Sequence, residues 1–355
     1  MKLFPHYTLV SMSVVVGSQS NIPRVYEDLD ELFADLENDL GSQIDVSSLP
    51  IVPPHNDRIF YLSENAYGSP CVSGYLVTAG PSAPRSRCFT IDLDHNLVYL
   101  RGTYSDYSRA IMLVPSDGEG NLYIARHNSR APDNWQQYED VMGIGHGSDF
   151  ARLVGSVMLV PLEVGVPRTQ LALITAPTDP ESFCTESVMA RIALLVSSSG
   201  RLELEVDVSL EDRNSGEIVP MERSEQNPTF FFLSTYKLTF IPSNVRASLV
   251  EIMNRVGLVR TVPNTFSVGC ENLINFLPSI VFTVKDAGVV AARIVLEPQD
   301  YFHIRPETRE CGCKIDLSDP EPVEHARFSF GMSLLENAGI FIDYNNEVLG
   351  LCDPL

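Results

Sequence analysis

The stretch that most constrains the fold of this 355-residue chain runs from Asn227 to Asn244, N-P-T-F-F-F-L-S-T-Y-K-L-T-F-I-P-S-N. It is rich in apolar, aromatic and β-branched residues and is bounded by proline on both sides. This pattern predicts a buried strand, a turn and a second short strand. After Pro242, the apolar residues Val245, Leu249 and Met253 recur at helical spacing, so a helix should follow directly.

Composition restricts the classes of partner that the chain can have. The chain carries 46 acidic and 25 basic residues, a formal net charge of −21. Nucleic acids and anionic membranes need a basic surface, so we expect neither as a partner. Hydrophobic content of 44%, with 24 prolines and 22 glycines, favours a globular, turn-rich all-β protein. Beyond the N-terminus no segment has the length of a membrane span, and we expect a monomer.

The N-terminal part divides into two predicted segments. Residues 1–20 hold one lysine, an apolar run and then small residues, which favours a signal peptide, with an apolar N-terminal strand as the alternative. Residues 21–57 read as an acidic helix and a linker. Over residues 25–40, apolar residues recur at helical spacing while seven acids fall between Glu27 and Asp39, which predicts an amphipathic helix with an acidic outer face. We favour a solvated helix packed on the body of the protein.

The seven cysteines lie far apart, at positions 71, 88, 184, 270, 311, 313 and 352. This spacing is typical of a secreted protein with a few disulfides and one remaining thiol. Cys311 and Cys313 could bind a metal with His303, but this spacing is too tight for a usual zinc site and no second ligand pair is near. We therefore expect no metal and no cofactor, and a location outside the cell or in a secretory or vacuolar lumen.

Several short motifs in the chain resemble those of one family. The pattern "L-T-x-x-P-S" before a helix occurs at residues 238–243, and a strand-and-turn pattern like the family's first catalytic loop occurs at 88–99. Residues 139–145 (E-D-V-M-G-I-G), 296–301 (L-E-P-Q-D-Y) and 328–351 carry further matches. Over residues 70–352 the chain is similar to the pepsin-like aspartic proteases. The resemblance implies a mainly β, bilobal fold with a few short helices, and lobes at 58–200 and 201–355.

The family's two acidic motifs are not kept. In the second half, the D-T-G or D-S-G motif falls on Leu233, Ser234 and Thr235. In the first half, counting forward from Phe89 puts the family's acid on Asp94, and counting back from Asn96 puts it on Ile91. If the resemblance holds, the floor of the interlobe cleft is formed by these residues: Asp92, Asp94, His95, Leu233, Ser234 and Thr235. The resemblance also implies that Cys270 pairs with Cys311 or Cys313.

The lost acids bear directly on the chemistry. Aspartic proteases need two carboxylates that share one proton, one activating water and the other polarising the carbonyl group. Leu233 can neither hold nor transfer a proton, so Asp94 would remain as a single candidate acid beside His95. A rescue would need Asp94 and His95 to act as a pair, or His146 or His303 to enter the cleft.

Three hypotheses follow for the function. The first is a catalytically inactive homologue of the proteases that binds a peptide or protein segment in its interlobe cleft. The second is an active aspartic endopeptidase with divergent loops, which requires a second carboxylate close to Asp92 or Asp94. The third is a structural protein without a ligand, whose cleft is filled by its own side chains, such as those of residues 25–57.

Overall fold

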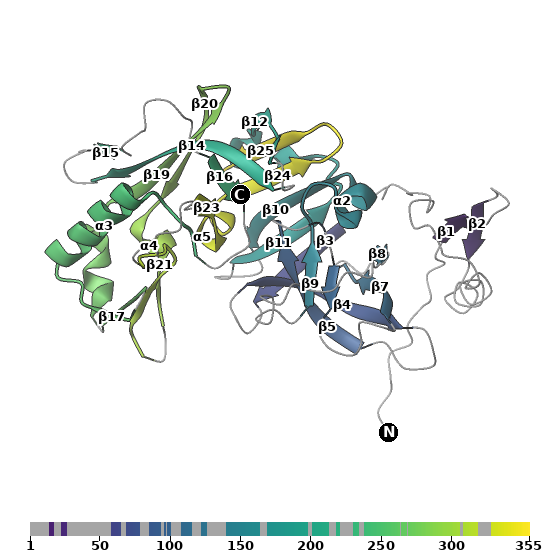
Figure 1. The fold of residues 1–355 in the computed structure, drawn as a ribbon, viewed down its shortest axis with the longest axis horizontal. Coiled ribbons are helices and arrows are strands. Elements are labelled where there is room, and N and C mark those ends of the chain that lie inside the picture. Colours follow the sequence, from purple (N-terminus) through teal and green to yellow (C-terminus); the bar gives the residue numbers. More distant parts are fainter. Residues whose placement is uncertain are drawn as a thin grey trace.

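The computed structural model describes the chain in the following ranges: 14–17, 23–26, 58–64, 69–78, 85–93, 96, 98–100, 108–115, 122–125, 140–163, 169–197, 201–212, 218–220, 230–233, 238–262, 264–267, 269–305, 308–318 and 328–355. The described part is mainly β, as predicted (Figure 1). Its α-helices are α2 (Asp149–Val154), α3 (Ser243–Arg255), α4 (Pro298–Tyr301) and α5 (Met332–Leu335). Single 3₁₀ turns are η5 (Pro180–Phe183), η6 (Thr185–Ser187), η7 (Cys270–Asn272) and η8 (Ile274–Phe276).

The largest sheet contains strands from both ends of the described chain. Its members are β3 (Arg58–Glu64), β4 (Pro70–Thr78), β5 (Arg85–Asp92), β6 (Val98–Leu100), β7 (Ser108–Leu113), β8 (Leu122–Ala125), β9 (Asp140–Gly143), β10 (Ser156–Glu163), β11 (Thr169–Thr175), β12 (Ala190–Ala193), β24 (Gly339–Asp343) and β25 (Val348–Cys352). Their order is β12-β25-β24-β10-β11-β3-β4-β5-β9-β6, with β7 on β4 and β8 on β7. Of the last two strands of the chain, β24 pairs with β10 and β25 pairs with β12.

A second sheet belongs to the middle of the chain. Its members are β13 (Leu195–Val196), β14 (Leu202–Glu211), β15 (Ile218–Pro220), β16 (Phe230–Leu233), β19 (Ser279–Asp286), β20 (Val289–Leu296) and β23 (Phe328–Phe330). The order is β20-β19-β14-β16-β23, with β13 and β15 also on β14. A smaller sheet is formed by β17 (Arg260–Val262), β18 (Thr265–Phe266), β22 (Cys311–Cys313) and β21 (Phe302–Ile304), in that order.

Side-chain periodicity explains the longest elements. Along β14, apolar residues alternate with polar ones, and every apolar member is buried while every polar member stays partly exposed. This is the pattern of a strand with one face on the core. In α3, Val245, Leu249 and Met253 lie on one buried face, as their spacing predicts. In the first half of the chain, β4 and β5 form a hairpin, because they pair antiparallel from Cys71–Thr90 to Leu76–Arg85.

The N-terminal prediction differs from the structure at one point. β1 (Val14–Gly17) and β2 (Pro23–Tyr26) form an antiparallel pair, so the predicted helix over 25–40 does not include its first two residues. The remaining residues of that helix lie outside the described part of the chain. The division into lobes at residue 200 stays a prediction, and it falls between β13 and β14.

Three disulfides and one free thiol account for the seven cysteines, as expected. The disulfides are Cys71–Cys88, Cys184–Cys352 and Cys270–Cys311, and Cys313 is free and buried. Cys184–Cys352 joins the segment before β12 to the end of β25, so it ties together residues 168 positions apart. None of the described helices is long and apolar enough to cross a membrane.

Candidate functional site

Strand β16 carries Leu233, the residue that the sequence motif assigns to the position of the family's second acid. It runs antiparallel to β14 and parallel to β23, and its last residue, Leu233, lies opposite Phe330. The ring of Phe231, two residues earlier, packs 6.0 Å from that of Phe282 and 4.9 Å from that of Phe330. Leu233 is 1% exposed. The predicted buried strand is therefore present, and its aromatic residues fix β16 within the core.

The chain is anchored again just after the loop that follows β16. Phe240 exchanges backbone hydrogen bonds with Ser329, its N–H donating over 2.9 Å. The buried hydroxyl oxygen of Thr239 accepts a hydrogen bond of 2.8 Å from the backbone N–H of Gly331. The second short strand of the prediction thus consists of the bridge residues Thr239 and Phe240. The loop is therefore held by strand pairing on both sides, through β16 before it and through Thr239 and Phe240 after it. Helix α3 begins at Ser243, three residues after Phe240.

A similar arrangement occurs in the first half of the chain. Strand β5 runs parallel to β9, with Ile91 opposite Met142 and Asp92 opposite Gly143. The backbone N–H of Ile144 donates to the carbonyl oxygen of Asp92 over 2.8 Å. After the intervening loop, β6 pairs with the other edge of β9. Each half therefore contains a strand, a loop and a return segment arranged around a second short strand.

The register of the two parallel strand pairs relates their residues to each other. Met142 and Phe330 each precede a glycine, and the residues opposite them are Ile91 and Leu233. Both of these opposite residues are aliphatic, and they are 0% and 1% exposed. In the register of the strand before each loop, Ile91 therefore lies opposite Met142 in the same way as Leu233 lies opposite Phe330.

When the counterpart of Leu233 is instead counted back from the segment after each loop, it falls one residue after Ile91. Tyr99 lies opposite Val141, and Phe240 lies opposite Ser329. Leu233 stands seven residues before Phe240, and the residue seven before Tyr99 is Asp92. The first loop is thus one residue longer than the second. The two strand registers therefore give Ile91 and Asp92 as alternative counterparts of Leu233, and neither gives Asp94.

The structure describes some of the predicted cleft-floor residues and leaves others out. Asp92 is buried, at 7% exposed, and Leu233 is buried as well. The other four residues of the predicted floor lie outside the described part of the chain: Asp94, His95, Ser234 and Thr235. Their roles stay predictions.

The two histidines considered for a rescue occupy different elements. His146 lies in the turn that follows β9, just before Ser148 caps α2 by accepting from the N–H of Ala151. His303 lies in β21 of the four-stranded sheet, opposite Gly312 of β22. A Cβ atom on Gly312 would come within 2.1 Å of the His303 ring, so only glycine leaves room for that ring.

A contact that the sequence did not reveal joins the end of β9 to the C-terminal hairpin. The hydroxyl group of Tyr344, in the turn between β24 and β25, donates to the carbonyl oxygen of Ile144 over 2.5 Å. Burial raises the pKa of the Tyr344 hydroxyl group, so it remains a donor at any pH at which the protein is folded. The two residues are 200 positions apart, and no local pattern predicts such a contact.

The sequence also did not reveal an ion pair between β5 and β9. Nη1 of Arg87 lies 2.6 Å from Oδ2 of Asp140, whose side chain is only 2% exposed. Asp140 opens the short strand that ends at Gly143. The ion pair therefore connects the two parallel strands near their starting ends, away from the loop that carries Asp94. The signal was present in the sequence as the acid that precedes V-M-G, but its partner was not identifiable.

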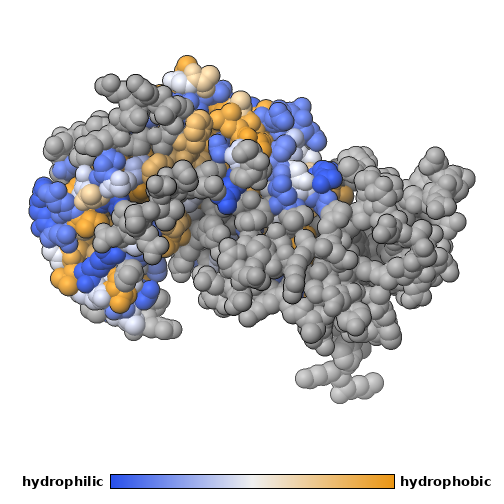
Figure 2. Space-filling view, in the orientation of Figure 1, coloured by the Kyte–Doolittle hydropathy of each residue, from blue (hydrophilic) through white to orange (hydrophobic). Residues whose placement is uncertain are grey.

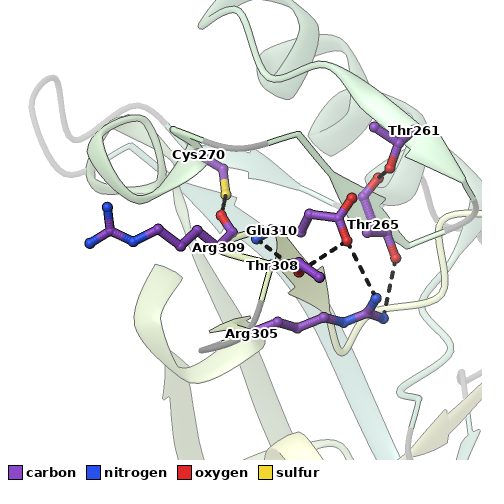
Figure 3. Close-up of polar contacts among 7 residues, drawn as sticks. All are labelled: Thr261, Thr265, Cys270, Arg305, Thr308, Arg309 and Glu310. Carbon is purple, nitrogen blue, oxygen red and sulfur yellow. Dashed lines mark hydrogen bonds and ion pairs between the residues drawn. The ribbon is translucent and has the colours of Figure 1, made fainter.

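The turn that connects β21 to β22 carries several polar contacts (Figure 3), and the Cys270–Cys311 disulfide joins the first residue of β22 to η7. Of the two partners considered for Cys270, the structure bonds Cys311. In the turn, the Arg305 guanidinium lies 3.7 Å from Oε2 of Glu310 and 3.5 Å from the Thr265 hydroxyl oxygen (Figure 3). These contacts hold the start of β22.

The free thiol lies two residues further along β22. Cys313 is buried, and burial raises its pKa to about 12. It is therefore protonated at neutral pH and cannot act as a thiolate nucleophile in the folded protein. Among the described residues, no three His, Cys, Asp or Glu side chains are grouped so as to hold a metal ion.

The arrangement supports a limited chemistry. The sequence motifs assign one of the family's two acids to the end of β5 or the loop after it, and the other to the end of β16. In this chain β5 ends in Ile91 and Asp92 and β16 ends in Leu233, and all three side chains are buried. A shared proton needs two carboxylates at close range, and Leu233 supplies none. Among the described residues that end these two strands, Asp92 is the one with a carboxylate.

Comparison with solved structures supports the same fold. The chain has the mainly β fold of the pepsin-like proteases, as the sequence motifs implied. Among solved structures, it is similar to basic 7S globulin from soybean (TM-score 0.58, 12% identity), covering 84% of this chain and 97% of that one. It is also similar to conglutin gamma, a basic 7S globulin from lupine seeds (TM-score 0.59, 11% identity), covering 84% and 95%. No family model and no curated protein matches the sequence.

Proposed function

We propose that this protein is a pepsin-fold homologue without proteolytic activity, which binds an extended segment of peptide or protein between its two lobes. The observation that carries the proposal is the position of Leu233. It ends a buried strand opposite Phe330, where the family's motif has an acid, and Ile91 has the same relation to Met142. With an aliphatic side chain at this position, the pair of coupled carboxylates cannot form.

The ligand class follows from the fold. An extended peptide can satisfy its backbone groups by pairing with strand edges, and side-chain pockets then determine its sequence preference. Loss of the acids removes hydrolysis but leaves such pairing possible. The similarity to two seed globulins supports the fold and not the ligand. Peptide binding is therefore the part of the proposal that most needs a direct test.

One observation keeps the active endopeptidase as a second candidate. Asp92 is a buried acid at the end of β5, next to Ile91. It is the counterpart of Leu233 when residues are counted back from the segment after each loop. A single carboxylate could activate water only with a partner acid, which Asp94 would have to supply. Catalysis by this pair predicts an acidic pH optimum and binding of pepstatin, an inhibitor of aspartic proteases.

We also propose that the protein works along the secretory route or in a vacuolar lumen, after removal of residues 1–20. Three disulfides support an oxidising compartment. The acidic balance supports neither a nucleic-acid partner nor an anionic membrane partner. Apart from its ligand, we propose that the protein is a monomer.

The binding proposal can be tested with a random library of ten-residue peptides passed over the immobilised, folded chain. Retained peptides should slow backbone hydrogen exchange in segments 91–98 and 233–240, the two loops with their flanking strands. Thr235→Trp should weaken binding at least tenfold, since it places bulk in the second loop. Val259→Lys, at an exposed position beside β17, should leave the affinity within twofold of the wild type. Melting temperatures establish that both variants fold.

Two results would contradict binding between the lobes. If no peptide is retained, the structural protein without a ligand becomes the better account. If peptides bind but exchange slows elsewhere, and Thr235→Trp binds like the wild type, the site has been placed wrongly.

A further inference from the structure

Strand β20 forms one edge of the seven-stranded sheet (Figure 1). It pairs with β19 on its inner side, and in the part of the chain that the structure describes no strand pairs with its outer side. Such an edge presents a row of unpaired backbone N–H and C=O groups, which can pair with another extended chain. The strand has eight residues, Val289–Leu296, long enough for a regular ladder with a partner.

The exposed side chains of this edge strand are mainly apolar. Val289 and Val290 are 70% and 61% exposed, and Val295 is also exposed. In Figure 2, hydrophobic side chains gather where β20 and the neighbouring β12 lie in Figure 1. The register shifts at Val290–Ala292, where β20 has one extra residue, and pairing is regular from Ala292 to Leu296. Exposed apolar groups clustered on one edge are typical of interaction sites.

The strand lacks the charge that usually protects such an edge. Natural edge strands are often guarded by an outward lysine or arginine or by a proline. The one charged residue of β20 is Arg293, and its Nη2 lies 2.5 Å from Oε2 of Glu211 on β14. Because β14 is two strands further into the sheet, the guanidinium group lies over the sheet face and is neutralised there. Among the described strands none pairs with the outer edge of β20, and β12 of the larger sheet lies close to it.

Two further exposed apolar residues, Leu195 and Val196, lie beside the turn that connects β19 to β20. Glu203 of β14 pairs with Leu195 of β13 and with Phe232 of β16, so β13 and β16 flank β14 on opposite sides. Glu205 pairs with β16 and with Lys285 of β19, so β19 lies on the same side as β13. The exposed residues Leu195 and Val196 therefore adjoin the β19–β20 turn. We name these two residues with Val289 and Val290 the hairpin patch.

The charge around the hairpin patch is mostly negative. Glu203, Glu205 and the exposed Asp286 lie on the strands and turn beside it. The nearby Lys285 is neutralised by Asp207, with Nζ 2.6 Å from Oδ2. Arg201 precedes β14, Arg191 lies on the neighbouring β12, where it pairs with Glu181, and the chain as a whole carries −21. A basic partner is attracted to this surface, whereas a second copy of the chain is repelled.

We propose that the outer edge of β20 binds an extended segment of a basic partner protein by strand addition. The segment would pair its backbone with β20, place apolar side chains on the hairpin patch and place lysine or arginine beside the surrounding acids. Alternation of apolar and polar residues with basic ends is the pattern that fits. This surface is separate from the loops of the proposed interlobe site, so the two proposals stand or fall independently.

The test uses the full chain and the synthetic peptide acetyl-Lys-Lys-Val-Thr-Val-Thr-Val-Lys-Lys-amide. Binding should slow hydrogen exchange of the β20 amides, and the dissociation constant should rise severalfold between 50 and 200 mM salt. Val290→Lys should weaken binding at least tenfold, because it adds a like charge and removes apolar contact. Val259→Lys is the matched control, since Val259 is as exposed as Val290 but flanks the four-stranded sheet, and its affinity should be unchanged.

Peptide controls separate backbone pairing from general charge attraction. The same peptide with alternate N-methylated amides should bind at least tenfold more weakly, because its backbone cannot complete the ladder. Glutamate in place of lysine should abolish binding. The proposal is overturned if β20 exchange is unaffected, or if the acidic peptide binds equally well. It is also overturned if sedimentation shows a dimer of the wild type that Val290→Lys abolishes, because a second copy then occupies the edge.

Discussion

At the scale of single residues, the proposal of an inactive homologue depends most on Leu233. It occupies a core position at the end of β16, surrounded by the strands that meet there, and the family's acid stands at this place in the motif. An acid functions at such a place only if polar groups hydrogen-bond its charged form, and in the family a second acid shares one proton with it. A leucine instead completes the apolar packing of the core.

Leu233→Asp should therefore destabilise the fold and fail to create a protease. Burial of an uncompensated carboxylate should lower the free energy of unfolding by about 4 kcal/mol or more, while Leu233→Met should cost under about 1.5 kcal/mol. Urea titration of both variants measures the difference. A Leu233→Asp variant as stable as the wild type would mean that the side chain faces solvent and that its described burial is wrong.

The buried thiol of Cys313 makes stability depend on pH in the alkaline range. Its pKa is about 12 in the folded protein against 9.0 as the ordinary value, so the unfolded chain loses this proton first. Stability from this group is therefore complete below pH 9 and is lost as pH rises toward 12, by up to about 1.4 kcal/mol per pH unit. The wild type should lose more stability than Cys313→Ala between pH 8 and 10.5 in urea titrations. Parallel curves for the two proteins would contradict the burial of this thiol.

At the scale of elements, local patterns predicted what local forces determine. The apolar spacing in residues 245–253 predicted α3, and the apolar stretch bounded by prolines after Asn227 predicted the buried strand β16. Partner strands from distant parts of the chain were not predictable, because backbone pairing does not depend on side-chain type. The placement of β24 beside β10 is an example. The N-terminal pattern favoured a helix from residue 25, whereas pairing with β1 makes residues 23–26 a strand.

The candidate site was predictable only in part for the same reason. The second loop could be located from the sequence because its motif aligns without a gap on Leu233. The first loop is one residue longer, so Ile91 and Asp92 both match by register and Asp94 matches by counting from Phe89. The contact between Tyr344 and Ile144 depends on how the C-terminal hairpin packs, which no motif encodes.

The parallel pair of β5 and β9 should depend strongly on its ion pair. Arg87→Met removes the guanidinium group that faces the buried carboxylate of Asp140, which should cost about 3–5 kcal/mol of unfolding free energy. Glu251→Gln removes the exposed ion pair with Arg255 on α3 and should cost about 0–1 kcal/mol. Urea unfolding compares the two variants. Equal and small losses would mean that Asp140 is solvated in solution.

At the scale of the whole molecule, the C-terminal strands join the two ends of the chain. β24 and β25 extend the sheet that begins at β3, and the Cys184–Cys352 disulfide closes the junction with β12. Tyr344 adds a hydrogen bond from this hairpin to the strand beside the first loop. The relative positions of the two loops therefore depend on contacts between residues far apart in sequence.

Removal of this disulfide should be more harmful than removal of the local one. In the chain-entropy account, Cys184–Cys352 closes a loop of 168 residues and contributes about 5 kcal/mol, whereas Cys71–Cys88 closes 17 residues and contributes about 3 kcal/mol. Paired substitutions to serine, compared by urea unfolding, measure both. A larger loss from Cys71→Ser with Cys88→Ser would show that the C-terminal strands hold without their disulfide.

The central claim is that the pepsin fold is kept here without its catalytic chemistry. The most direct measurement is a proteolysis assay on the purified mature chain from pH 3 to pH 7, with and without pepstatin, and with Asp94→Ala as the matched variant. The account predicts no cleavage at any pH from a protein that circular dichroism shows to be folded. Cleavage that pepstatin inhibits and that Asp94→Ala abolishes would contradict it and establish an active aspartic endopeptidase.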